Sequence, residues 1–278
     1  MNTMPAINGE KSPARTVVLC ADDYALHPLV DEAVEQLTLQ GRLSATSCMT
    51  TSPHWRQAAR RLPALRPRLS LGLHFNLTYG KPLSEAIRAL PQFCNSNGEF
   101  DLKLSRKRLW LGRQAREAVA AELAAQWQHC LDCGLTHSHL DSHQHVHNRW
   151  PIGEIVARFA AREGVPIRLA RNVGHNIGPA KRLFKTLLNQ RLRQLARLTA
   201  DHVCTPVDLR NGLAPEHGVL EVVAHPSALG SHDFGDAYLA SGESLKALLD
   251  QRLAGVPRIG YGALRASPQP ALDTASNR

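Results

Sequence analysis

The sequence has no apolar run close to the roughly 18 residues that a membrane-spanning helix needs. Its opening segment, MNTMPAINGEKSPAR, has no hydrophobic stretch of the kind found in secretory signals. Six cysteines in 278 residues are too few for a disulfide framework. No basic motif interleaved with aromatic residues, typical of single-stranded nucleic-acid binding, is present. We therefore expect a soluble, cytoplasmic globular protein that binds no nucleic acid.

The composition and length indicate one large folded domain. Hydrophobic residues make up 43% of the chain and charged residues 21%, which suits a buried core and not a disordered chain. Single α/β domains commonly reach this length. Residues 1–14 and 267–278 are polar or contain proline and show no periodicity. We expect flexible tails there, on either side of a single domain at 15–266.

The net charge of +9 arises from two local segments. One contains Lys103, Arg106, Lys107, Arg108, Arg113 and Arg116, and the other contains Lys181, Arg182, Lys185, Arg191, Arg193 and Arg197. Removing these twelve from the 33 basic residues leaves 21 against 24 acidic residues. The rest of the chain is thus nearly neutral, which also argues against a general nucleic-acid-binding surface.

Strand-like and helix-like segments alternate along the chain. Apolar or β-branched runs typical of buried parallel strands lie at 16–20, 45–49, 69–75, 136–140 and 219–224, and 166–169 is expected to be extended. Helical spacing is found at 29–37, 115–130, 152–162 and 243–253. The alternation predicts a single-domain distorted (β/α) barrel with mostly parallel strands. The irregular segment 78–111 predicts a long loop.

Histidines are concentrated in the segment HSHLDSHQHVH at 137–147. If this segment is extended, Asp141, His143, His145 and His147 share one face, because side chains alternate along a strand. The segment follows a predicted strand, and the carboxyl ends of strands are where α/β folds place ligands. Imidazoles beside a carboxylate predict a metal site. The alternative is a surface tract that binds metal adventitiously.

Three further strand ends carry similar chemistry. Asp22 and Asp23 follow the strand at 16–20, His74 lies in the otherwise apolar segment 69–75, and His225 ends the strand at 219–224. Each has an ordinary explanation: an aspartate can cap a helix, and a lone histidine can be a hydrogen-bonded core residue. Their occurrence together at the same rim of a parallel barrel favours one shared site.

The motifs ADDY at 21–24, GLHFNLT at 72–78, HLDSHQHVH at 139–147 and His-Pro at 225–226 resemble the YdjC-like carbohydrate deacetylase family, which includes chitooligosaccharide and hopanoid-associated deacetylases. The resemblance runs in order over residues 16–264. It implies a distorted barrel with one divalent metal ion and, as a further expectation, a homodimer. Two positions depart from the family pattern. Ala25 stands where glycine is usual, and Ser227 stands where glycine or alanine is usual.

By position in these motifs, the resemblance implies that Asp23, His74 and His143 bind the metal, that Asp22 is the general base, and that His225 is the general acid. Asp141, His145, His147 and Arg168 are expected to support the ligands or the substrate, Asp141 by orienting a metal-binding histidine. Arg168 is expected to meet a carboxylate near the rim. The alternative for His145 and His147 is that they only pack. One carboxylate and two imidazoles suit zinc and also magnesium, manganese, cobalt or nickel.

The implied activity is the metal-dependent hydrolysis of the N-acetyl group of an acetylated amino sugar or its conjugate, either an oligosaccharide or a lipid-linked sugar. Two alternatives remain open: a metal-dependent hydrolase of another amide or ester, and a non-catalytic metal-binding or glycan-binding module. The pairing of Asp22 with His225 argues against the module, because binding alone needs no acid and base.

Residues 181–198 have apolar side chains at helical spacing opposite basic ones. This pattern predicts an amphipathic helix packed on the barrel with a solvated basic face. The alternative is a helix that makes peripheral contact with a membrane.

Overall fold

The computed structural model describes residues 15–230 and 233–265. The tails expected at 1–14 and 267–278, and the expected domain end at 266, lie outside this part of the chain.

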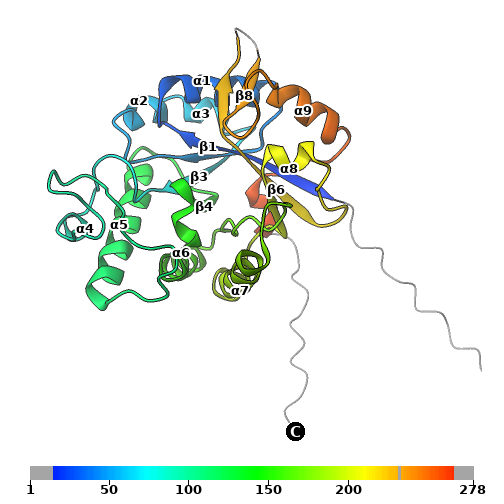
Figure 1. Ribbon diagram of the computed structural model, residues 1–278. Coiled ribbons are helices and arrows are strands. Elements are labelled where there is room, and N and C mark those ends of the chain that lie inside the picture. The colour runs from blue at the N-terminus through cyan, green and yellow to red at the C-terminus, as the bar shows by residue number, and fades with distance from the viewer. Residues whose placement is uncertain (1–14, 231–232, 266–278) are drawn as a thin grey trace, which may run out of the picture.

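Six parallel strands form one sheet in the order β4-β3-β2-β1-β6-β5. Each strand is short and almost wholly buried, as expected for strands covered on both faces. The strands are β1 (Thr16–Tyr24), β2 (Ala45–Cys48), β3 (Ser70–Phe75), β4 (His139–Ser142), β5 (His202–Cys204) and β6 (Val219–Ala224). Figure 1 shows the sheet passing through the middle of the molecule, with helices on both sides.

Isolated parallel bridges connect the two ends of this sheet. Ile167 pairs with Leu140 of β4 on one side and with Thr199, just before β5, on the other. The segment predicted to be extended at 166–169 therefore lies between the edge strands, and the sheet curls into a distorted barrel. This confirms the predicted fold class.

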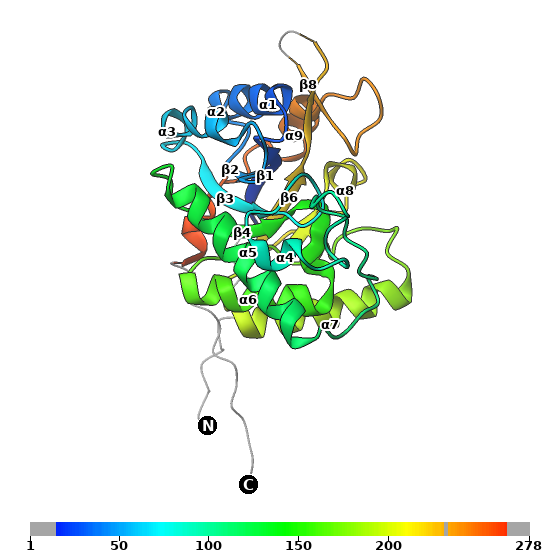
Figure 2. The ribbon, with the colours of Figure 1, turned by 90° about the vertical axis from the view of Figure 1, so that its left-hand side faces the viewer.

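Helices cover the sheet in two groups, each with its own apolar core. Figures 1 and 2 show the two groups on opposite sides of the strands. One group comprises α1 (Pro28–Leu39), α2 (Trp55–Ala59), α3 (Leu62–Leu65), α8 (Pro206–Arg210) and α9 (Leu245–Arg252). The other comprises α4 (Glu85–Arg88), α5 (Arg113–Leu131), α6 (Trp150–Glu163) and α7 (Pro179–Ala196).

The helix α7 is the amphipathic segment predicted at 181–198. Leu188 and Leu192 are fully buried in the core shared with α6, and Phe184 packs partly against it. The apolar stripe therefore faces the barrel, as the first interpretation predicted. In the described part of the chain, no helix combines the length and the apolarity that crossing a membrane requires.

Two local predictions need correction, and one pair of strands was not predicted. The strand predicted at 136–140 lies at β4, two to three residues later, and is followed by the 3-10 helix η1 (His143–Asn148). The predicted loop at 78–111 contains α4 and a bridge between Cys94 and Phe100. No pattern in the sequence predicted the antiparallel pair β7 (Pro226–Ala228) and β8 (Phe234–Asp236).

The interior of the barrel changes character along its length. Val18, Cys20 and Ala45 form a small apolar core with Tyr261 and Leu264 of the 3-10 helix η2 (Tyr261–Arg265). Beyond Cys20, towards the carboxyl ends of the strands, the interior becomes polar and ionisable. The candidate site lies at this end, where parallel barrels bind their ligands.

Candidate active site

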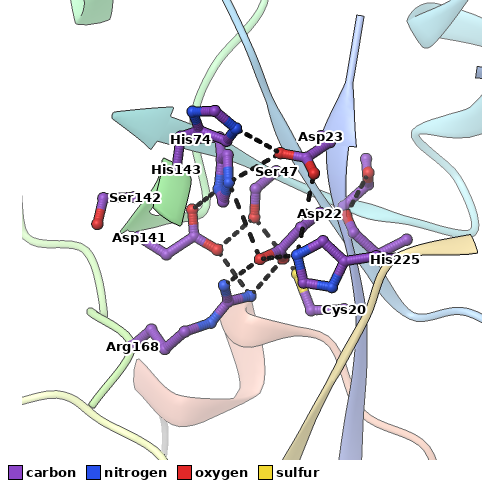
Figure 3. A network of polar contacts seen from close by, with 12 residues as sticks. Cys20, Asp22, Asp23, Ser47, His74, Asp141, Ser142, His143, Arg168 and His225 are labelled. Carbon is purple, nitrogen blue, oxygen red and sulfur yellow. Dashed lines mark hydrogen bonds and ion pairs between the residues drawn. The ribbon is translucent and has the colours of Figure 1, made fainter. Parts of the chain in front are cut away.

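A bulge near the end of β1 positions Asp22 and Asp23. The register with β2 shifts between Ala21 and Tyr24, and Asp23 has a φ of 66°, in the left-handed region that aspartate tolerates better than most residues. Adjacent side chains of a regular strand point to opposite faces. The bulge removes this constraint, and both carboxylates point into the same cluster (Figure 3).

Asp23, His74 and His143 converge on one point. The Oδ1 atom of Asp23 lies 3.2 Å from Nε2 of His74 and 3.8 Å from Nε2 of His143. Figure 3 shows both imidazoles directed at this carboxylate. Oδ1 of Asp23 is buried and has no hydrogen-bond partner among the described residues. A buried carboxylate oxygen without a hydrogen bond is costly unless positive charge lies beside it, from the ring of His74 or from a bound cation.

The other ring nitrogens hold the two histidines in place. His74 donates from Nδ1 to Oδ1 of Asp141 at 2.7 Å, and these two residues are register partners on β3 and β4. Nδ1 of His143 lies 2.7 Å from Oγ1 of Thr78. Metal-binding histidines are commonly oriented in this way through their second nitrogen. Both Nε2 atoms are thereby directed at Asp23.

The surplus of carboxylates around His74 favours positive charge at this point. Burial lowers the pKa of His74, but Asp141 and Asp22 overcome this and raise it to about 10. Burial raises the pKa of Asp23, yet its contact with His74 and the charges of the neighbouring histidines bring it below the usual range. Burial and the charge of His74 lower the pKa of His143 to about 4. His143 is thus neutral beside the ionised Asp23, whereas His74 carries a proton that a bound cation would displace from Nε2.

Arg168 lies at the centre of the buried carboxylates. It is 1% exposed and binds Asp22 through two hydrogen bonds of 2.6 and 2.7 Å. It also pairs with Asp141 at 2.7 Å and with Glu221 of β6. The sequence-based expectation that Arg168 meets a carboxylate is therefore confirmed, although the contact is in the interior and involves three acids. A planar guanidinium suits this multiple pairing better than an ammonium would.

His225 stands at the opening of the site. Its Nε2 lies 3.7 Å from Asp22 and 3.9 Å from Asp23, and its side chain is 21% exposed. Its backbone N–H donates to Asp236 of β8 at 2.6 Å. The ring packs edge-on against Tyr238. The hairpin of β7 and β8 therefore fixes the histidine that ends β6.

The prediction that Asp141, His143, His145 and His147 share one face is wrong. β4 ends at Ser142, and Gln144 and His145 adopt left-handed φ values of 48° and 53°, so the alternation of side chains stops. Asp141 and His143 reach the cluster, whereas His147 is buried against Ser142. His145 lines an adjoining cavity of about 870 Å³, which also contacts Arg168 and Tyr238.

Ser47 and Glu221 belong to the network although sequence reasoning gave them no role. Ser47 of β2 donates to Asp141, and Glu221 pairs with Arg168. Glu221 is the one charged residue in the buried run VLEVVA, and a charge in such a run signals a buried partner. Ser47 had no comparable signal, because small polar residues are common in strands.

Among residues 15–230 and 233–265, two groups of buried side chains place their ligand atoms within 4.8 Å of one another: Cys20, His139 and Asp141, and Asp22, His74 and Asp141. A divalent cation could therefore bind in this region. Both groups use Asp141, however, whose oxygens already accept from His74, Ser47 and Arg168. In the part of the chain that the structure describes, Oδ1 of Asp23 accepts no hydrogen bond, and the two Nε2 atoms face it. The distances of 3.2 and 3.8 Å from Oδ1 of Asp23 to the two Nε2 atoms are those of ligands that share one cation, since ligands about 2.1 Å from an ion lie about 3–4 Å apart. The three atoms are not all within 4.8 Å of one another, so a bound cation would draw the two imidazoles closer together.

Comparison with known proteins agrees with this geometry. The family model described as YdjC-like protein matches residues 16–254. A carbohydrate deacetylase of Geobacillus stearothermophilus is 30% identical over 83% of this chain and 84% of its own. A chitooligosaccharide deacetylase of Klebsiella pneumoniae (strain 342) is 29% identical over 81% of this chain and 86% of its own.

Among solved structures, a proposed cellobiose-phosphate cleavage protein of Enterococcus faecalis V583 shares the fold, with a TM-score of 0.66 and 19% identity. The match covers 91% of this chain and 99% of that chain. The family model spans the four motifs up to the His-Pro pair at 225–226, which include the converging residues of the site. The chain therefore belongs to the YdjC-like protein family.

Proposed function

We propose that this protein is a metal-dependent hydrolase that removes the N-acetyl group from an acetylated amino sugar or its conjugate. The observation that carries the proposal is the convergence of Asp23, His74 and His143, with Asp22 and His225 beside them. Relatives over most of the chain are named as carbohydrate and chitooligosaccharide deacetylases, which supports the substrate class.

One divalent cation would be held by Oδ1 of Asp23 and the Nε2 atoms of His74 and His143. Three protein ligands leave further coordination positions open, as in catalytic and not structural sites. When bound, such an ion lowers the pKa of a water molecule towards neutrality and polarises a carbonyl group. Zinc and magnesium are our first choices, and manganese, cobalt or nickel also suits the donor set.

The remaining residues supply proton transfer. Oδ2 of Asp22 faces the site, 3.9 Å from Nε2 of His74, and the fork of Arg168 fixes both of its oxygens. Asp22 accepts a proton from the attacking water, as a general base. His225 donates a proton from Nε2 to the amine nitrogen that leaves, because an amide nitrogen departs poorly without one. The products are acetate and a free amino sugar.

The direct test is acetate release from N-acetylglucosamine oligomers, measured before and after treatment with a chelator. We expect release that the chelator abolishes and a divalent metal restores. Release that is unaffected by complete removal of metal would contradict metal dependence. Retained binding of the oligomers without any release would favour the alternative of a binding module.

We also propose that the protein works in the cytoplasm, and the six free cysteines, five of them buried, support a reducing compartment. Subcellular fractionation tests this location. A homodimer is proposed from the family resemblance, and sedimentation equilibrium measures it.

Peripheral membrane contact through 181–198 remains a narrower proposal. The stripe of α7 that contains Leu188 and Leu192 faces the core, so contact would depend on the exposed Leu183 and Leu187 and on the basic side chains around them. Co-sedimentation with anionic vesicles at low salt tests it, and absence of binding would contradict it.

A further inference from the structure

A cavity of about 870 Å³ lies beside the site. It shares Arg168, His145 and Tyr238 with the surroundings of the catalytic cluster. It then extends between the residues near 106–109 and the first turns of α7. Because Arg168 contacts Asp22 and Tyr238 packs against His225, the cavity adjoins the site and has room for the part of a substrate that lies beyond its N-acetyl group.

Seven basic side chains line the cavity, and no acidic side chain does. Two of the seven are neutralised, since Arg168 pairs with three carboxylates and Arg171 pairs with Asp208 at 2.6 Å. Within residues 15–230 and 233–265, the other five have no carboxylate oxygen within 4.0 Å. These five are Arg106, Lys107, Arg149, Lys181 and Lys185.

Residues from both basic segments of the sequence thus line one cavity, and several basic side chains of its wall repel one another. Burial, followed by the charges of Lys181 and Arg171, lowers the pKa of Lys185 to about 8. Burial and the charge of Arg106 lower the pKa of Arg149. Like charges held together in a partly buried space are stabilised by an anion that contacts them.

The cavity is also apolar over much of its wall. Leu169, Phe184, Val203 and Val207 line it, and Leu109, which is 64% exposed, also contributes to it. A small inorganic anion would leave these side chains uncovered. An amphiphilic anion would contact both the basic and the apolar parts of the wall.

We propose that this cavity binds a phosphate-bearing apolar substituent, of the prenyl phosphate class, attached to the amino sugar. The identity of the sugar end rests on the proposed function, but binding of the substituent can be measured without turnover. Failure of the deacetylase proposal and failure of this one are therefore distinguishable.

The experiment is titration calorimetry of the full chain with three probes below their aggregation concentrations: farnesyl phosphate, farnesol and inorganic phosphate. The test variant is Lys181→Gln/Lys185→Gln. The control is Arg182→Gln/Arg193→Gln, which removes two charges from the same helix at exposed positions outside the cavity. Far-UV circular dichroism confirms that each variant is folded.

We expect farnesyl phosphate to bind at least about tenfold more tightly than either other probe. The lysine variant should weaken its binding at least about tenfold, since each charge-assisted hydrogen bond is worth roughly that factor, and the control variant should not. Equal affinity for farnesol and farnesyl phosphate, or unchanged affinity in the lysine variant, would overturn the proposal. If inorganic phosphate binds as tightly as farnesyl phosphate, the proposal that the cavity binds an apolar substituent is overturned.

Discussion

Single residues in this barrel show how closely the site is packed. A Cβ atom on Gly72 would lie 2.2 Å from Nε2 of His139, a fully buried ring stacked on Tyr261. The glycine of the motif GLHFNLT thus makes room for a neighbouring strand's histidine, two residues before Asp141. Its role is steric and does not arise from an unusual φ value.

Gly72→Ala should therefore lower the free energy of unfolding by about 1–3 kcal/mol, the usual cost of overpacking a core. Chemical denaturation measures the change. Gly178→Ala is the matched control, because no atom lies within 4 Å of its Cβ position. Equal stability of the two variants would show that His139 can move aside.

Asp22→Asn tests the general base. The amide keeps an oxygen for one hydrogen bond from Arg168 but cannot accept the proton of water. We expect turnover to fall by about 10²–10⁴-fold, the usual contribution of general acid–base catalysis, with bound metal unchanged. The control is Asp250→Asn, at a surface pair with Arg42. Full turnover in Asp22→Asn would contradict the assignment.

At the scale of elements, the short segment around Ile167 both closes the barrel and supplies Arg168. Removing this guanidinium leaves Glu221 without a counter-charge, and leaves the buried Asp22 and Asp141 to share the charge of His74. Breaking a buried ion pair typically costs about 3–5 kcal/mol.

Arg168→Met should thus be destabilised by about that amount, measured by urea denaturation. Arg158→Met, on the exposed face of α6, should change stability by no more than about 0.5 kcal/mol. A loss below 1 kcal/mol in Arg168→Met would mean that the acids are neutralised in another way.

The sequence predicted most of the parallel strands because buried strands are continuous apolar runs, as in β1 and β6. It also predicted that Asp22, His74 and His225 meet, because strand ends of a barrel share one rim. It failed at 143–147, since left-handed backbone at Gln144 and His145 leaves no clear residue signature. It also failed at β7 and β8, whose three-residue strands are too short for a periodic pattern.

For the molecule as a whole, buried neutral histidines make stability depend on pH. Burial lowers the pKa of His137 from 6.5 to about 4. The unfolded chain therefore binds a proton more readily than the folded one, so stability is complete above pH 6.5 and is lost as the pH falls towards 4. Between pH 7 and pH 5, this residue alone should lower the free energy of unfolding by about 2 kcal/mol.

His137→Gln should accordingly reduce the loss of unfolding free energy between pH 7 and pH 5 by about 2 kcal/mol. Urea denaturation at the two pH values measures it. The control is His217→Gln, at an exposed position. In this variant the loss of unfolding free energy between pH 7 and pH 5 should equal that of the original protein. An unchanged loss in His137→Gln would show that His137 becomes protonated without unfolding.

We propose that Asp23, His74 and His143 hold one divalent cation. The most direct test of this proposal is the metal content, by mass spectrometry, of protein purified without added ions, compared with His74→Ala, His143→Ala and the control His145→Ala. We predict about one equivalent in the original protein and in His145→Ala, and much less in the other two. Equal metal content in the original protein and the three variants would show that the metal does not bind at Asp23, His74 and His143. The absence of metal from the original protein after incubation with zinc or magnesium would show the same.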